Sequence, residues 1–364
     1  MESVALNLFG DVYAGRRILI TGHTGFKGSW LALWLHELGA KVVGIALDPG
    51  SQLNHWDLLN LPVRDIRTDI CDASPLAQAV REANPEVVFH LAAQSLVRKS
   101  YREPLETWST NVMGTANLLN ACRQAQDLLA VVVVTTDKVY ENNEWPWGYR
   151  ETDSIGGRDP YSASKAATEF VVESYRKSFF SGDHAPQIAT ARAGNVIGGG
   201  DWAEDRLIPD IFRAAARGES VEIRYPNATR PWQHVLDCLA GYLGLGQRLL
   251  ERRGMYAEAW NFGPDEFDNR TVAEVLRAMS LHWPLAKWHM SEEAHPQEAC
   301  LLNLDTAKAR RRLGWRPVWT LDESIEMTAA WYSAYLAGAE LRSRAQLSAF
   351  VAAAREREIG WSVG

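Results

Sequence analysis

The hydrophobic positions in the first half of the chain fall into short continuous runs rather than an alternating pattern. These mostly apolar runs occupy residues 17–21, 42–47, 87–91, 130–134 and 188–192. Continuous runs of this length are typical of strands buried on both faces of a parallel sheet. Helical patterns separate them, beginning with residues 29–38, which Gly39 ends. The alternation predicts an α/β fold, a doubly wound parallel sheet.

The second half of the chain is predicted to be mainly helical. Helices are expected near residues 207–217, 235–250, 271–281, 305–313 and 321–336, with short strands at 221–223 and 260–262. The tail from residue 341 to 357 is rich in Ala, Arg and Glu, and we predict a solvated helix there.

A glycine-rich turn connects the first strand to the first helix, with the spacing G-x-x-G-x-x-G. Glycines allow the backbone to approach a phosphate, which the N-terminus of the following helix attracts. Asp48 ends the second strand, where an acid accepts hydrogen bonds from a ribose 2′-hydroxyl and repels a 2′-phosphate. We therefore predict a dinucleotide site that prefers NAD to NADP. The turn residues expected at this cofactor are Gly22, Thr24, Gly25, Phe26, Lys27 and Gly28.

Other strand ends and helix starts supply further candidates. Asp69 and Ile70 either flank an adenine or belong to a cap of the next helix. Asn111 is either a buried structural amide or a support for a catalytic lysine at the cofactor, and we favour the supporting role. Small residues after a strand leave room for a ligand at the edge of the sheet. The remaining predicted contacts are Leu91, Ala92, Ala93 and Thr135 for the cofactor, and Gln94 and Ser95 for the substrate.

Two pairs of polar residues are candidates for the chemistry. Thr136 and Asp137 follow the run at 130–134, where open α/β sheets place functional residues, although such a pair also caps helices. Tyr161 and Lys165 lie four residues apart, so a helix would place both on one face. A nearby ammonium lowers the pKa of a phenol. The second pair is suited to take a proton from an alcohol while a cofactor takes the hydride.

The bulk properties narrow the class of protein. The 364 residues are 46% hydrophobic and 23% charged, as in ordinary globular proteins. A formal net charge of −7 without a long basic run argues against nucleic acid or an anionic membrane as partner. We expect Cys71, Cys122, Cys238 and Cys300 to be reduced, buried thiols, and no metal site is predicted. The N-terminus lacks signal-peptide features and no apolar run reaches about 20 residues, so a cytoplasmic protein without a membrane span is expected.

Several longer segments resemble those of one enzyme family. They are GHTGFKGSWL (22–31), HLAAQSLVRKSY (90–101), STNVMGT (109–115), TTDKVY (135–140), PYSASK (160–165), RAGNVIGGGDWAEDRLIPDI (192–211) and RPWQHVL (230–236). Together they make the chain similar to the extended short-chain dehydrogenase/reductase family, to about residue 331. Within that family the chain resembles the nucleotide-sugar 4,6-dehydratases, most closely those that act on CDP-D-glucose.

The resemblance implies two domains and a reaction. A modified Rossmann NAD-binding domain is expected in residues 1–192, with a return segment at about 232–262, and a smaller C-terminal α/β substrate-binding domain mainly in residues 193–364. The implied lyase is NAD-dependent and converts CDP-D-glucose to CDP-4-keto-6-deoxy-D-glucose and water. It does so by C4 oxidation, C5/C6 elimination and return of the hydride to C6.

The resemblance also assigns roles to the candidate residues. Tyr161 would take the proton of the 4-hydroxyl, while Lys165 lowers the Tyr161 pKa and bonds the nicotinamide ribose. Thr136 would bond the 4-oxygen, and Asp137 would protonate the departing 6-hydroxyl. Lys138 departs from the commoner glutamate that removes the C5 proton, although CDP-glucose members share the lysine. An ammonium cannot take a proton, so Lys138 is either deprotonated by its surroundings or acts electrostatically on the enolate.

Substrate contacts are implied as well. Arg230 and Asn195 match positions that grip the diphosphate, which suits a guanidinium, although a surface ion pair is the alternative for Arg230. Arg206 and Leu207 are expected to border the nucleotide. Family analogy implies a homodimer or homotetramer, and a 3,6-dideoxyhexose for a cell-surface polysaccharide such as the lipopolysaccharide O-antigen.

Other interpretations stay open. A dehydratase for another nucleotide sugar, or a sugar-nucleotide 4-epimerase, would use Tyr161 and Lys165, but an epimerase needs no acid at position 137. A non-catalytic NAD-binding sensor or scaffold would not need the complete set of catalytic candidates.

Overall fold

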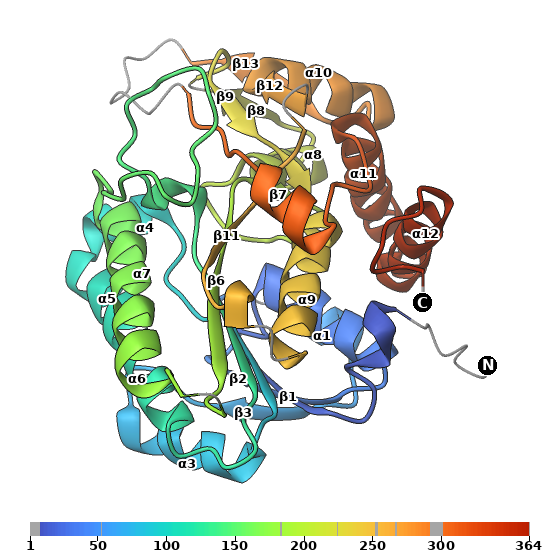
Figure 1. The fold of residues 1–364 in the computed structure, drawn as a ribbon. Coiled ribbons are helices and arrows are strands. Elements are labelled where there is room, and N and C mark those ends of the chain that lie inside the picture. Colours follow the sequence, from blue (N-terminus) through green and yellow to red (C-terminus); the bar gives the residue numbers. More distant parts are fainter. Residues whose placement is uncertain are drawn as a thin grey trace.

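A parallel seven-stranded sheet forms the base of the molecule (Figure 1). The computed structural model describes residues 8–51, 53–182, 184–223, 225–251, 254–265, 268–291 and 301–363. The strand order is β11-β6-β5-β4-β1-β2-β3, and all neighbours are parallel. The strands are β1 (Arg17–Thr21), β2 (Lys41–Ala46), β3 (Arg64–Arg67), β4 (Val87–His90), β5 (Ala130–Val134), β6 (Gln187–Ala193) and β11 (Ala259–Phe262).

The order of the strands confirms the predicted doubly wound sheet. From β1 the chain builds outward through β2 and β3, then returns to add β4, β5 and β6 on the other side of β1. The reversal leaves a crevice above the carboxyl ends of β1 and β4, where ligands bind in such sheets. Alternate residues of the buried strands face opposite layers: Val131 and Val133 lie in one hydrophobic cluster, and Ala130 and Val132 in the other.

Helices cover both faces of the sheet (Figure 1). One layer contains α3 (Ala73–Ala83), α6 (Gly114–Cys122) and α7 (Pro160–Phe179), whose apolar residues form a cluster with β4 and β5. The other layer contains α1 (Phe26–Glu37) and α9 (Val235–Leu250). Both α9 and β11 lie in the segment at about 232–262 that was expected to return to the first domain. Strand β11 pairs with β6 and completes the sheet, and α9 packs on it. The domain bounds at 192 and 193 stay a prediction.

The helical stretch before α6 consists of three short segments. It runs through α4 (Val97–Arg102), α5 (Pro104–Trp108) and the π-helical turn η2 (Ser109–Met113). Pro104 occupies the first turn of α5, where a missing N–H costs nothing. The π-turn contains Asn111, whose side chain consequently faces the interior.

Smaller elements lie above the carboxyl edge of the sheet, in the upper part of Figure 1. Three two-stranded sheets, β7–β10, β8–β13 and β9–β12, accompany the helices there. The strands are β7 (Val196–Ile197), β8 (Ser220–Ile223), β9 (Thr229–Pro231), β10 (Gln233–His234), β12 (Asn269–Thr271) and β13 (Lys287–Met290). Elsewhere in the described residues, the structure has the helices η1 (Phe9–Asp11), α2 (His55–Leu59), η3 (Asp137–Val139), α8 (Leu207–Ala216), η4 (Gly254–Tyr256), α10 (Val272–His282), η6 (Ala309–Leu313), α11 (Leu321–Leu336) and α12 (Ser343–Glu356).

The helix predicted at the C-terminal end is present as α12, but the prediction that it is solvated was wrong. Leu347, Phe350 and Val351 of α12 are buried. The ring of Phe350 meets Trp34 of α1 edge-on and stacks on Trp361. Polar contacts add to this docking, because His55 Nε2 lies 2.7 Å from Ser343 Oγ. The apolar residues of α12 recur about one turn apart and form a narrow stripe on one face. The abundance of Ala, Arg and Glu in this segment made that stripe hard to recognise in the sequence.

The cysteines agree only in part with the prediction that all four are buried thiols. Cys122 and Cys238 are free and buried, but Cys71 is only partly buried, and Cys300 lies outside the described residues. No helix among the described residues is long and apolar enough to cross a membrane. The described part of the chain also holds no cluster of three His, Cys, Asp or Glu side chains suited to a metal ion.

Candidate active site

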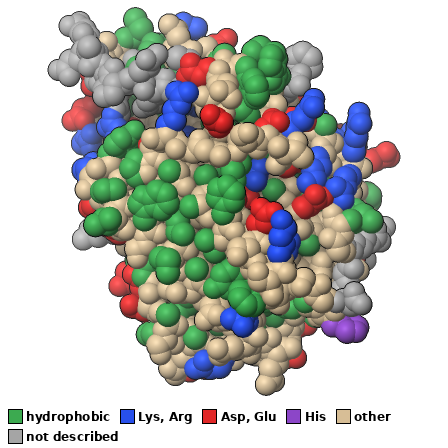
Figure 2. All heavy atoms as spheres, turned by 60° about the vertical axis from the view of Figure 1, so that its left-hand side comes forward, with side chains coloured by type: hydrophobic (Ala, Val, Ile, Leu, Met, Phe, Trp, Pro, Cys, Tyr) green, Lys and Arg blue, Asp and Glu red, His purple; other side chains and the backbone are tan. Residues whose placement is uncertain are grey.

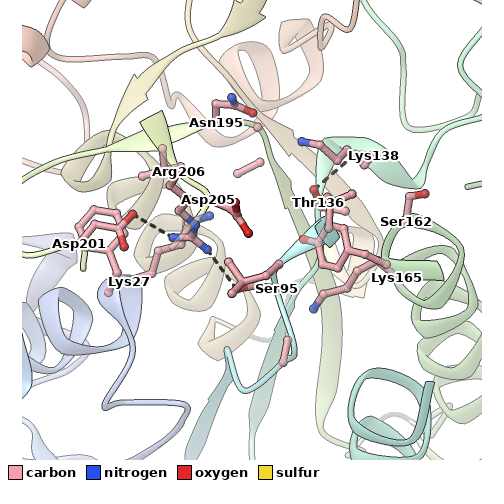
Figure 3. A pocket seen from close by; sticks show the side chains of 18 of the residues that line it. Lys27, Ser95, Thr136, Lys138, Ser162, Lys165, Asn195, Asp201, Asp205 and Arg206 are labelled. Carbon is pink, nitrogen blue, oxygen red and sulfur yellow. Dashed lines mark hydrogen bonds and ion pairs between the residues drawn. The ribbon is translucent and has the colours of Figure 1, made fainter. Parts of the chain in front are cut away.

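A cleft of about 1140 Å³ opens above the carboxyl ends of β1, β4 and β5. The β1–α1 turn, the start of α7 and the loops around residues 193–210 and 221–232 form its walls (Figure 3). Most of the predicted residues line it: Gly22, Thr24, Gly25, Phe26, Lys27, Gly28, Asp69, Ile70, Leu91, Ala92, Ala93, Ser95, Thr135, Thr136, Lys138, Tyr161, Lys165, Asn195, Arg206, Leu207 and Arg230. The cleft therefore gathers residues from both halves of the sequence.

The glycine turn brings backbone N–H groups to the cleft. Helix α1 begins at Phe26, not at Ser29, with Gly25 as an N-cap that offers no side-chain hydrogen bond. Gly22 has φ of 76°, and a Cβ on Gly28 would lie 2.1 Å from the Gly22 carbonyl oxygen. A Cβ on Gly25 would meet only that same oxygen, at 3.4 Å, so the space before the helix is open. This cradle fits the diphosphate of a dinucleotide.

The adenosine end of the expected cofactor site is only partly enclosed. Asp69 and Ile70 line the cleft, and Asp69 Oδ1 accepts from the Cys71 N–H at 2.8 Å. The N-cap of α3 is Asp72, which makes no side-chain capping bond. Asp48 lies outside the cleft wall with its side chain 88% exposed, 3.6 Å from Arg67 Nε.

Helix α7 positions the tyrosine and the lysine. Asp159 caps it reciprocally with Ser162, and Pro160 occupies its first turn, so the helix begins immediately before Tyr161. Burial raises the pKa of Tyr161 to about 12, and a hydrogen bond with Thr136 opposes that increase. Among the groups that lower the pKa of Tyr161, Thr136 therefore has the largest effect. The sequence had instead suggested the charge of Lys165.

Lys165 is held against the sheet. Its Nζ donates to the Val134 carbonyl at 3.1 Å, and the side chain is buried. Burial, and then the charge of Lys27, lower the pKa of Lys165 to about 8. The lysine therefore carries its charge at neutral pH but releases it far more readily than an exposed lysine.

The segment after β5 presents three adjacent polar side chains. Thr136 Oγ1 donates to Asp137 Oδ1 at 2.9 Å, and Lys138 Nζ lies 3.4 Å from the same oxygen. Asp137 is 1% exposed, and its Oδ2 has no hydrogen-bond partner. A Cβ on Gly194, which lines the cleft, would lie 2.9 Å from that oxygen. Because Gly194 has no side chain, the Asp137 carboxyl lies close to the cleft, although Asp137 itself does not line it.

Gln94 and Asn111 lie behind the cleft wall. Asn111 Oδ1 accepts from the Gln94 N–H at 2.8 Å, and its Nδ2 donates to the Gln94 carbonyl and to Ser164 Oγ. The Gln94 side chain bonds its own loop and Thr107. These contacts favour the structural alternative for Asn111, and its support of Lys165 is at most indirect, through α7.

Arg206 connects the two sides of the cleft (Figure 3). Its guanidinium donates to Asp201 Oδ2 at 3.0 Å and to Ser95 Oγ at 3.0 Å. The charge of Asp201 raises the pKa of Arg206. Sequence reasoning missed Asp201, although its place after three glycines and before Trp202 in the segment GGGDW could have drawn attention to it.

A second bridge lies beside Arg206. Arg98 of α4 pairs with Asp205 at 2.7 Å, and Asp205 lines the cleft. Tyr225 also lines the cleft and was not predicted. Arg98 and Asp205 lie in the segments 90–101 and 192–211 that carry the family resemblance, but only the fold shows that they pair at the site.

Known proteins match both the sequence and the fold. A family model described as GDP-mannose 4,6 dehydratase matches residues 19–328. The CDP-glucose 4,6-dehydratase of Salmonella typhimurium is 46% identical over 354 residues, covering 94% of this chain and 98% of that protein.

Solved structures agree on the architecture. A UDP-glucose 4-epimerase of Thermus thermophilus, in complex with NAD, superposes with a TM-score of 0.75 at 26% identity, covering 87% of this chain and 99% of that one. The epimerase Mth375 of Methanothermobacter thermautotrophicus gives a TM-score of 0.80 at 24% identity over 90% of this chain and 95% of its own, a likeness of fold alone. With its glycine cradle, its Tyr161–Lys165 helix and this match over most of its length, the chain belongs to the GDP-mannose 4,6-dehydratase family of extended short-chain dehydrogenases/reductases.

Proposed function

We propose that the protein is an NAD-dependent hydro-lyase that converts CDP-D-glucose to CDP-4-keto-6-deoxy-D-glucose and water. The observation that carries the proposal is the buried Asp137 carboxyl beside Thr136 and Tyr161, an acid next to the residues suited to oxidise an alcohol. The choice of CDP rests on the 46% identity with the Salmonella enzyme.

The cofactor and the first proton transfer use the lower part of the cleft. NAD, when bound, accepts the hydride from C4 and returns it to C6. The N–H groups at the start of α1 would hold its diphosphate, and Asp48 its adenosine ribose. Tyr161 takes the proton of the 4-hydroxyl, with Thr136 bonded to the same oxygen. The charged Lys165 would hold the nicotinamide ribose, and Thr136 opposes the raised pKa of Tyr161.

The elimination uses the segment after β5. The 4-ketone makes the C5 proton acidic, and protonated Asp137 gives its proton to the departing 6-hydroxyl through its unpartnered Oδ2. Lys138 Nζ lies 3.4 Å from Asp137 Oδ1. With its proton passed to Asp137, the neutral Lys138 amine would take the C5 proton, and the ammonium so formed would stabilise the enolate. On the substrate side, Arg230 and Asn195 would bind the diphosphate, and Arg206 and Leu207 would border the nucleotide.

Isotope transfer tests the proposal. CDP-D-glucose deuterated at C4 should give a 4-keto product that carries the label at C6, as read by mass spectrometry and NMR. UDP-, dTDP- and GDP-glucose run in parallel should react poorly. A 4-keto product with unlabelled C6 would contradict internal hydride return.

A 4-epimerase acting on another nucleotide sugar is the second candidate, because the fold superposes on a UDP-glucose 4-epimerase. That activity would give a product with inverted C4, no ketone and no loss of water. The same labelled substrates therefore separate the two functions.

We also propose that the enzyme assembles as a homodimer or homotetramer in the cytoplasm, where its free thiols stay reduced. Leu105, Trp108, Met113 and Phe170 are exposed on α5, η2 and α7, and Figure 2 shows hydrophobic side chains gathered on this side. A second copy would cover this face. Light scattering should give at least a dimer for the wild type and a smaller species for Leu105→Lys; a monomeric wild type would contradict it.

A further inference from the structure

A buried ion pair lies between helix α7 and strand β6, behind the cleft. Glu169 Oε1 accepts from Arg192 Nε at 2.9 Å, and Glu169 Oε2 accepts from Arg192 Nη2 at 3.0 Å. Their side chains are 6% and 4% exposed, and neither residue lines the cleft. Buried pairs of this kind rarely add stability over an apolar pair, so their value must be sought in what they hold in place.

The carboxylate of Glu169 ties α7 to the end of β5. It accepts from Thr135 Oγ1 at 2.6 Å and from Thr190 Oγ1 of β6 at 2.7 Å. Thr135 directly precedes Thr136. One helical turn before Glu169, Lys165 donates to the Val134 carbonyl at 3.1 Å. The catalytic helix and the catalytic strand are thus joined at two successive turns.

Arg192 holds the other end of the same segment. Its Nη1 donates to Tyr140 Oη at 2.9 Å, and Tyr140 Oη donates to Asn261 Oδ1 of β11 at 2.7 Å. Tyr140 follows η3, the short helix that contains Asp137 and Lys138. Residues 135–140 are therefore anchored at both ends by one ion pair, and Thr136, Asp137 and Lys138 lie between the anchors.

We infer that the Glu169–Arg192 pair is a positioning device for the reaction, which fixes residues 135–140 against α7 and so keeps Thr136 and Asp137 in register with Tyr161. The inference rests on the proposed function and adds positioning residues to it. The placement of Thr136 beside Tyr161, where Thr136 opposes the raised pKa of the phenol, is the arrangement that the pair protects. A displacement of about 1 Å in such a contact costs on the order of 100-fold in rate.

The pair also contributes to the charge around Lys165. Lys165 is faced by Lys27 from α1, by Glu169 from its own helix and by His90 from β4. Burial and Lys27 lower the pKa of Lys165, and Glu169 raises it. Neutralising Glu169 leaves Arg192 without its partner, so Lys165 would lose its proton at lower pH.

Glu169 is itself surrounded by charged groups from other elements. Arg192 of β6 bonds it, and Arg176 from the next turns of α7 interacts with its charge. Glu151 faces Arg192 from the loop before α7. A pH profile of a Glu169 variant must therefore be compared with a variant that removes both partners of the pair.

The first test replaces Glu169 by Gln. In a single turnover with CDP-D-glucose we expect cofactor reduction to slow by about 30- to 100-fold. Binding of CDP should stay within about twofold, and the alkaline limb of the rate profile should move down by roughly one pH unit. Glu169→Asp should recover most of the rate. The matched control is Glu173→Gln, one turn further on α7, where Glu173 pairs with Lys177 in solvent; it should behave as wild type.

A second variant distinguishes loss of positioning from misfolding. Glu169→Met with Arg192→Met removes both charges and keeps apolar volume, which buried pairs tolerate. It should fold, bind CDP and reduce the cofactor slowly. A folded double variant as fast as wild type would overturn the inference, as would a Glu169→Gln enzyme with unchanged rate and pH profile.

Crystal structures of the variants decide the inference independently of the substrate. We expect the distance between Thr136 Oγ1 and Tyr161 Oη to increase in both variants and to stay at its wild-type value in Glu173→Gln. If wild type does not reduce its cofactor with CDP-D-glucose, the proposed function fails, but this geometric comparison still supports or refutes the positioning role.

Discussion

Replacing Asp137 by Asn separates the two halves of the proposed reaction. The amide has the same shape and keeps an oxygen for the Thr136 hydroxyl, which donates to Asp137 Oδ1 at 2.9 Å. Lys138 loses its anionic partner, but its side chain is 32% exposed and water can replace the contact. The fold should therefore survive, while the carboxyl proton needed by the departing hydroxyl is gone.

The expected effect follows from the role of the lost group. General acid catalysis contributes about 10²- to 10⁴-fold, equivalent to about 3–5 kcal/mol of the barrier to water loss. Oxidation at C4 depends on Tyr161, Thr136 and Lys165 and should proceed within a few-fold of wild type. Reduced cofactor should therefore accumulate on the variant and stay there.

Stopped-flow absorbance of the reduced nicotinamide, with quenched-flow analysis of the sugar, measures both steps on one sample. Oxidation by the variant acts as its internal control. Water loss at the wild-type rate would remove Asp137 from the role of acid. An equal loss in both steps would instead mean that the residue holds Thr136, and would refute the separation argued above.

Three further predictions concern the fold and the cofactor turn. Phe350→Ala removes a buried ring among tryptophans and should lower the free energy of unfolding in urea by about 3–5 kcal/mol; Phe179→Ala, at a 48% exposed residue, should cost less than about 1 kcal/mol, and equal losses would contradict the docking of α12. Burial raises the pKa of Asp237 to about 8, so the native state holds the Asp237 proton more tightly than the unfolded state does. The contribution of this proton to stability therefore falls as pH rises from about 4 to about 8. The urea midpoint should depend less on pH in Asp237→Asn than in the wild type, and parallel pH profiles would refute this prediction. Gly28→Ala would place Cβ 2.1 Å from the Gly22 carbonyl oxygen, so the purified variant should carry little nicotinamide by chromatography, whereas wild-type content would contradict the cradle.

The sequence predicted the sheet well because its signals are local. Continuous apolar runs such as 130–134 mark strands buried by helices on both sides, and the order of runs and helices specifies the winding. The start of α7 was equally readable, since Asp159 and Pro160 determine it by capping alone. Most of the candidate site followed, because strand ends in a parallel sheet meet at one edge.

What the sequence could not give depends on contacts between distant segments. The side chain of Lys165 donates to the Val134 carbonyl, and the charge of Lys27 lowers its pKa, although neither residue is near Lys165 in the chain. The π-turn that contains Asn111 was not indicated by any residue pattern. The burial of α12 required a partner surface on α1, and composition alone cannot reveal one.

The docking of the chain's two ends has a consequence for synthesis. The Phe9 N–H donates to the Trp361 carbonyl at 2.8 Å, their rings stack, and α12 covers Trp34. The residues that shield this aromatic surface are synthesised long after the surface itself. The nascent chain therefore exposes an apolar surface until α12 has been made, and a chain that stopped before α12 would leave that surface open to chaperones and proteases.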